Sequence, residues 1–92
     1  MISLIAAVTT EATSTVFVMS GEGKIISDPL ATGEYATLLE ERPNGDYLPV
    51  PNDKGLGVVL RPGQESHVFV GYGNYKVYKS VTAAAVGVGL EQ

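Results

Sequence analysis

The chain contains no cysteine among its 92 residues. Disulfide bonds and metal sites built from thiolates are therefore excluded. Basic residues are also few, with six Lys and Arg against ten Asp and Glu and a formal net charge of −4. Phosphate binding requires a concentrated basic face, and these six cations are scattered along the sequence. We therefore expect no nucleic-acid partner.

Long hydrophobic runs are absent as well. The apolar stretch 1–8 is followed by Thr9, Thr10 and Glu11, so it is too short to cross a bilayer, and no cationic leader precedes it. We expect no membrane partner, no signal peptide and no transmembrane segment, and we expect synthesis in the cytoplasm.

Helical periodicity is missing too. The best helical candidate, 34–42, is short and lies between Gly and Pro. A hydrophobic content of 45% with 17% charged residues argues against disorder. Segments rich in β-branched and aromatic residues recur at roughly 8–12-residue spacing. The sequence predicts one all-β domain over 1–92, a small β-sandwich of about eight short antiparallel strands, Ig-like or jelly-roll-like, with a small barrel as the alternative.

Turn chemistry separates these segments. Pro43-Asn-Gly-Asp46 is the strongest signal, because Asn-Gly supplies the left-handed residues of a tight hairpin. Pro62-Gly63 predicts a type II turn. Further turns or loops are expected at 20–23, 28–33, 52–55 and 71–74.

The C-terminal segment alternates with period two, which is typical of a strand whose two faces meet different surroundings. Ala84, Val86, Val88 and Leu90 form one face, and Ala85, Gly87 and Gly89 form the other. A face with almost no side chains suits the close approach of another backbone, sheet or subunit. We take Ala85, Gly87 and Gly89 as a candidate interface, and expect Val at Gly87 or Gly89 to block assembly while the monomer still folds. The alternative is that a neighbouring aromatic of the same domain covers them.

Tyrosines gather shortly before that segment. Tyr72, Tyr75 and Tyr78 lie within seven residues. Tyr suits interfaces, because its ring buries area while its hydroxyl keeps a hydrogen bond. All three are candidate interface residues, and an aromatic surface of this kind could also bind sugars. The alternative is that Tyr75 fills the core with Val77 while Tyr78 covers its rim.

Residues for catalysis are sparse. His67 is the only histidine and lies between apolar residues on an expected strand. No Gly-x-Ser-x-Gly elbow occurs, and Gly21-Glu-Gly-Lys24 lacks the length and the following helix of a phosphate loop, so we read it as a hairpin turn.

Carboxylates form no clear site either. Glu40 and Glu41 are adjacent, so on a strand they point to opposite faces. Asp46 and Asp53 flank a loop and could converge on Ca²⁺, which is a weak signal without EF-hand spacing. We therefore expect no enzyme activity, no cofactor and no metal.

The order of motifs resembles small all-β virion proteins of tailed bacteriophages, which decorate heads or form connector and tail parts. The segments that carry the resemblance are Val16-Phe-Val-Met-Ser-Gly21, Leu30-Ala-Thr-Gly-Glu34, Asn44-Gly-Asp-Tyr-Leu-Pro-Val50, Gly73-Asn-Tyr-Lys-Val-Tyr-Lys79 and Ala85-Val-Gly-Val-Gly-Leu90. The resemblance implies a structural role in many copies per particle.

On that basis we expect a non-enzymatic virion protein, a head decoration or capsid-stabilising protein that binds the capsid surface as a homo-oligomer. Its partner would be the major capsid protein or another virion protein, and its location the virion. A tail or connector component is one alternative. A carbohydrate-binding β-sandwich that uses Tyr72, Tyr75 and Tyr78 is another, and a small hydrolase or metal-dependent enzyme is the least favoured.

Overall fold

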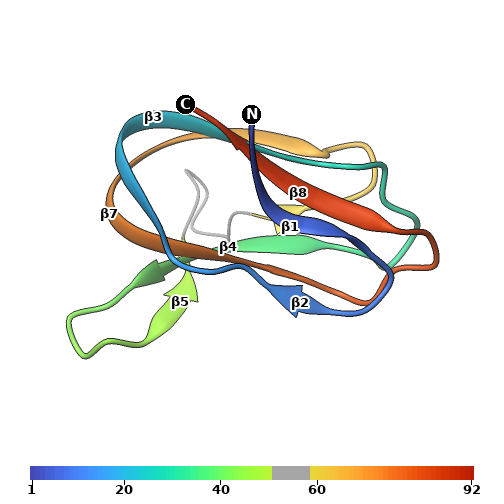
Figure 1. The fold of residues 1–92 in the computed structure, drawn as a ribbon, viewed down its shortest axis with the longest axis horizontal. Helices are drawn as coiled ribbons and strands as arrows, with labels where there is room; N and C mark the ends of the chain where they lie inside the picture. The colour runs from blue at the N-terminus through green and yellow to red at the C-terminus, as the bar shows by residue number, and fades with distance from the viewer. Residues whose placement is uncertain (51–58) are drawn as a thin grey trace.

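The fold consists of antiparallel β-strands, and the computed structural model describes residues 1–50 and 59–92. No helix occurs in these residues, so the all-β prediction is confirmed. The strands are shown in Figure 1 and have these bounds: β1 (Ile2–Val8), β2 (Ala12–Thr13), β3 (Phe17–Ser27), β4 (Ala36–Glu41), β5 (Tyr47–Pro49), β6 (Val59–Leu60), β7 (Ser66–Lys79) and β8 (Val86–Glu91).

Hydrogen bonding joins all the strands into one sheet, in the order β1-β8-β3-β7-β4-β5, with β2 on β7 and β6 on β4. The long strands β3 and β7 pair over 17–26 and 66–75 and curve together (Figure 1). Their curvature folds the sheet over on itself into two facing layers. The β1 layer consists of β1, β8 and the halves of β3 and β7 next to them. The β4 layer consists of β2, β4, β5, β6 and the other halves of β3 and β7. The predicted small sandwich-like fold is confirmed.

The core lies between the two layers. Alternate residues of each strand point into it, as period-two patterning requires. The β1 layer contributes Ile25 and the face of β8 that carries Val86, Val88 and Leu90, and the β4 layer contributes alternate residues of β4 and β7. The most deeply buried of these apolar side chains are Met19, Ile25, Leu38, Leu60, Val77, Val86 and Leu90.

Glycines make the fold-over possible. Gly21 of β3 lies directly opposite Gly71 of β7, and Gly21 and Gly73 have φ of 146° and 115°. Backbone in this region favours Gly, and Gly within a strand allows a sharp bend. The predicted turns at 20–23 and 71–74, including the hairpin reading of Gly21–Lys24, are therefore wrong. The paired glycines bend both strands and leave the ladder unbroken.

The other turn predictions vary in outcome. Residues 43–46 form the β4–β5 hairpin, where Gly45 has φ of 90° and the Arg42 N–H donates to the Asp46 carbonyl at 2.7 Å. Pro62-Gly63 also turns as predicted, with φ of 83° at Gly63 and a bridge between Arg61 and Gln64. The expected loop at 52–55, which includes Asp53, lies outside the described residues.

A buried lysine ties together the loops at one end of the domain. The Lys79 side chain is 1% exposed, and its ammonium donates to the Thr10 carbonyl at 2.7 Å, the Ser80 carbonyl at 3.0 Å and the Thr82 Oγ1 at 3.2 Å. A buried charge is tolerated only when its donors are satisfied, and here three acceptors meet all three. Lys79 therefore fixes the β1–β2 and β7–β8 connections against the end of β7.

Candidate interaction surface

The smooth side of β8 faces outward from the β1 layer. Val86, Val88 and Leu90 are buried, so Gly87 and Gly89 point to the opposite side. A Cβ at Gly87 would lie 2.9 Å from the carbonyl oxygen of Ile5 on β1. The close backbone approach expected from the glycines is thus present within the chain. The predicted covering aromatic is wrong, because the nearest atoms at Gly87 and Gly89 belong to β1 and Met1.

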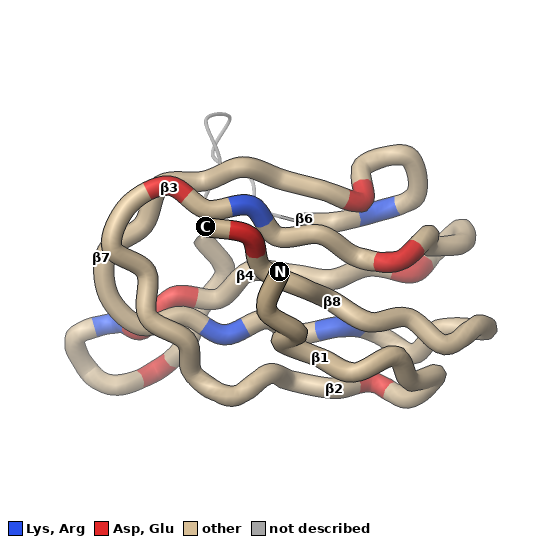
Figure 2. The backbone as a smooth tube through the Cα atoms, turned by 45° about the horizontal axis from the view of Figure 1, so that its top comes forward, with Lys and Arg blue, Asp and Glu red and all other residues tan. Residues whose placement is uncertain are grey.

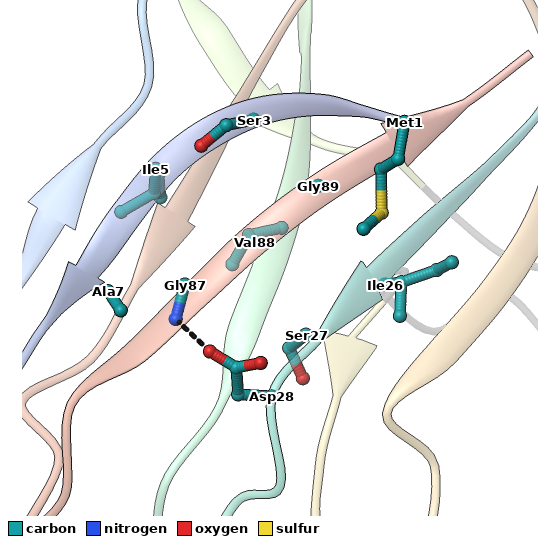
Figure 3. Close-up of a pocket in the computed structure, with 10 residues that line it drawn as sticks. All are labelled: Met1, Ser3, Ile5, Ala7, Ile26, Ser27, Asp28, Gly87, Val88 and Gly89. Carbon is teal, nitrogen blue, oxygen red and sulfur yellow. Dashed lines mark hydrogen bonds between the residues drawn. The ribbon is translucent and has the colours of Figure 1, made fainter.

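A shallow, open pocket lies over these glycines (Figure 3). Its volume is about 280 Å³. Gly87, Gly89 and Ile26 are among the residues that line it, and the Met1 side chain lies next to Gly89. The Asp28 carboxylate closes one end and accepts a hydrogen bond from the Gly87 N–H at 2.9 Å. The remaining interface candidate on this segment, Ala85, is exposed and precedes the first residue of β8.

The three predicted tyrosines do not form one surface. Tyr75 is 5% exposed and packs against the rings of Phe17 and Phe69 in the core. Its assignment as an interface residue is therefore wrong, and the core alternative holds. Tyr78 is half-buried on the outer side of the β4 layer. Tyr72 is 75% exposed on the convex side of the bend, next to Gly71. Side chains alternate along β7, so Tyr75 points to the opposite side from Tyr72 and Tyr78. The bend at Gly71 and Gly73 then separates Tyr72 from Tyr78.

Tyr72 and the glycines of β8 share one face, which we call the outer face. It comprises the outward residues of β8, of β3 from Val18 to Ile26, and of β7 from Ser66 to Tyr72. Its large apolar side chains are 54–75% exposed: Val18, Val68, Val70 and Tyr72. A contiguous exposed apolar surface on a small protein marks an interaction site more often than isolated exposed side chains do.

The opposite side of the molecule is different. On the outer side of the β4 layer, the ammonium of Lys76 lies 4.5 Å from the centre of the Tyr47 ring, and the Tyr47 hydroxyl donates to Glu41 at 3.1 Å. Burial and the neighbouring Glu41 carboxylate raise the pKa of Tyr47. The Tyr47 side chain on this surface thus contacts residues of the same chain.

Tyr78 shows the same self-contained arrangement. Its hydroxyl donates to Glu11 at 2.7 Å, and its ring lies 6.0 Å from that of Tyr35. The hydrogen bond to the Glu11 carboxylate, followed by burial and the negative charge of Glu11, raises the pKa of Tyr78 to about 12. By contrast, no hydrogen bond to the Tyr72 hydroxyl is found in the described part of the chain.

The valines of the outer face were not identified from the sequence. Val68, Val70 and Tyr72 alternate with Phe69 and Gly71, so β7 carries apolar residues on both faces here. Two apolar faces are typical of a strand covered on both sides. Since only one side of this strand faces the core, that pattern could have indicated an external contact.

No group of three or more His, Asp or Glu that could hold a metal ion occurs among the described residues. His67 is half-buried in the β3–β7 ladder. Basic residues of the described chain lie apart from one another (Figure 2). Within those same residues, no helix is long and apolar enough to span a membrane.

The chain thus has the architecture of a small sandwich-like β protein with one exposed apolar sheet face. Among solved structures, it is similar to the crystal structure of SPBc2 prophage-derived protein YomS, with a TM-score of 0.73. The two share 17% identical residues over 96% of this chain and 86% of the other. At this identity the likeness shows the fold. No family model matches the chain, and no curated protein matches it.

Proposed function

We propose that the protein is a non-enzymatic structural component of a bacteriophage virion, a head decoration or capsid-stabilising protein that acts as an oligomer. The observation that carries the proposal is the outer face, where Val18, Val68, Val70 and Tyr72 are exposed together on one sheet. Such a face stabilises a complex by removing apolar area from water and requires no reactive group.

The phage context rests on two independent likenesses. The motif order resembles small virion proteins of tailed phages, and the similar solved structure bears the name of a prophage-derived protein. The partner in this proposal is the major capsid protein or another virion protein. A tail or connector position uses the same kind of surface and remains the nearest alternative within the class.

A carbohydrate-binding role receives less support. Stacking on sugars from three tyrosines would require Tyr72, Tyr75 and Tyr78 on one side, yet they lie on the outer face, in the core and on the β4 layer respectively. A single exposed ring, Tyr72, is left on the outer face. Binding of a sugar would therefore have to use other groups.

The test is the presence and copy number of the protein in particles from a host that carries its gene. Purified particles would be analysed by quantitative mass spectrometry against the major capsid protein as the internal reference. The proposal predicts a fixed copy number set by the symmetry of the head, and a tail or connector component would give a much smaller one. Absence from intact particles, with the protein found free in the lysate, would overturn the proposal, and a glycan array would then be the next experiment.

A further inference from the structure

The β4–β5 hairpin carries the one asparagine of the chain that is followed by glycine. The chain has three asparagines, Asn44, Asn52 and Asn74, and the residues after them are Gly, Asp and Tyr. Asn44 and Gly45 are both exposed at the end of this hairpin, which extends beyond the rest of the β4 layer (Figure 1). Glycine has no Cβ to obstruct the approach of its backbone nitrogen to the preceding side chain. The side-chain amide of Asn44 is therefore open to attack by the Gly45 nitrogen.

Attack by this nitrogen converts the asparagine into an acid without any catalytic residue. The Gly45 backbone nitrogen loses its proton to water or hydroxide and forms a bond to the Asn44 Cγ, while the side-chain nitrogen takes up a proton and leaves as ammonia. Water then hydrolyses the cyclic imide by breaking one of its two carbonyl–nitrogen bonds. Cleavage of the side-chain bond gives aspartate, and cleavage of the main-chain bond gives isoaspartate. Each event adds one negative charge to a chain whose formal net charge is −4.

In the folded chain, hydrogen bonds engage both reacting groups. The Gly45 N–H donates to the Arg42 carbonyl at 2.8 Å, and this bond breaks when the nitrogen loses its proton. The Asn44 Nδ2, which leaves as ammonia, donates to the Asp46 carboxylate at 3.0 Å. A third bond, from the Asp46 N–H to the Asn44 Oδ1 at 3.1 Å, fixes the orientation of the amide. The reaction therefore requires the turn to open.

We propose that Asn44 is a site of spontaneous deamidation whose rate is set by the hairpin, slow while the turn is closed and fast when it opens. The product weakens the hairpin in turn, because a second carboxylate then lies beside Asp46 where the Asn44 Nδ2 had donated a hydrogen bond. Like charges at this separation repel each other. Isoaspartate also lengthens the main chain within the turn. The site lies on the β4 layer, so the inference is independent of the proposed role of the outer face.

The experiment follows the mass of the full chain over time at mildly alkaline pH, once in buffer and once in concentrated urea. Peptide mass spectrometry with electron-transfer fragmentation assigns the mass gain to a residue and distinguishes aspartate from isoaspartate. Conversion of Asn44 is expected to be about tenfold faster or more in urea, because opening of the hydrogen bonds limits the rate in the folded chain. Asn74, which is followed by Tyr75 on β7, is the internal control and should remain unconverted in buffer.

Asp46→Ala separates the effect of the hairpin from the reactivity of the local sequence. The substitution removes the carboxylate that accepts from the Asn44 Nδ2. Folded Asp46→Ala should deamidate several-fold faster than folded wild type, whereas the two chains should react at similar rates in urea, where no hairpin is formed. Glu22→Ala, which removes an equal charge from β3, is the matched control and should react like wild type in buffer. Circular dichroism of each variant confirms that it is folded in buffer.

Hydrogen exchange tests the effect of the product on the hairpin. In Asn44→Asp, the Arg42 and Gly45 amides, which both donate within the hairpin, should exchange several-fold faster than in wild type.

Four outcomes overturn the inference. They are no conversion of Asn44 in urea, equal rates in buffer and in urea, no acceleration of folded Asp46→Ala beyond its acceleration in urea, and unchanged exchange in Asn44→Asp. None of these measurements involves particles, so their failure is distinct from failure of the proposed function.

Discussion

The ring of Tyr75 lies directly over Gly71, four residues earlier on the same strand. A Cβ at Gly71 would be 2.5 Å from the Tyr75 Oη and 2.8 Å from its Cζ. The same relationship occurs on β3, where the Met19 side chain occupies the space next to Gly23. On both strands a large core side chain thus fills the inner side of the bend, and glycine leaves the room for it.

Gly71→Ala should therefore destabilise the fold by about 1–3 kcal/mol through overpacking. The backbone at Gly71 does not have positive φ, so the effect is steric. Urea denaturation measures the free energy of unfolding. In a Tyr75→Phe background the Oη contact is absent, and the cost of Gly71→Ala should fall by about 1 kcal/mol. An equal cost in both backgrounds would contradict this account of the bend.

Lys79→Met should lower the free energy of unfolding by about 2–4 kcal/mol, because the carbonyls of Thr10 and Ser80 and the buried Thr82 hydroxyl lose their donor. Lys76→Met is the matched control. Lys76 lies over the ring of Tyr47, and its loss should cost less than about 1 kcal/mol. Similar effects of the two substitutions in chemical denaturation would show that Lys79 does not hold the loops.

Gly87→Val should disturb the monomer, in contrast to the expectation from sequence that only assembly would suffer. A Cβ at Gly87 meets backbone atoms of Ile5 and Ala7, at 2.9 and 3.2 Å, which cannot move without displacing β1. Hydrogen exchange should show faster exchange along β1. Gly89→Ala should have a smaller effect, since its nearest contact is the flexible Met1 side chain. Unchanged exchange in Gly87→Val would contradict the close packing of β1 on β8.

Tyr78 should ionise later than an ordinary tyrosine. Its pKa is raised to about 12 because its neutral hydroxyl donates to Glu11. Since the folded state holds this proton more tightly, the contribution to stability is fully present below the usual tyrosine pKa of 10.0 and is lost as pH rises through about 12. Tyrosinate absorbance should show this late step in wild type and lose it in Tyr78→Phe. Glu11→Gln should move the step toward lower pH.

Local pattern was sufficient for parts of the fold. Period-two alternation correctly predicted that Val86, Val88 and Leu90 share one face, and this face lies in the core, whereas Ala84, predicted on the same face, is exposed. Asn44-Gly45 correctly marked a hairpin. Both signals act over a few residues, so no knowledge of the rest of the chain is needed.

Glycine-rich segments were misread because glycine permits a turn and a strand bend equally well. Only the pairing of Gly21 with Gly71, which lies fifty residues further along the chain, shows that these glycines form a strand bend and not a turn. For the same reason the tyrosines could be assigned to opposite faces from their spacing, but not to core or surface. That choice depends on the rings of Phe17 and Phe69 around Tyr75, and Phe17 comes from a distant segment of the chain. The outer face was not predicted, because valine favours strands whether or not a second layer covers its side chain.

The most direct test of the central claim compares Val70→Lys with Leu48→Lys in binding to particles that lack the protein. Val70 is 66% exposed on the outer face, and Leu48 is 49% exposed on β5 of the other layer, so each variant adds the same charge at an exposed apolar site. The account predicts that Val70→Lys abolishes co-sedimentation with particles while Leu48→Lys binds like wild type. Equal binding of both variants would contradict the claim that the outer face is the contact surface.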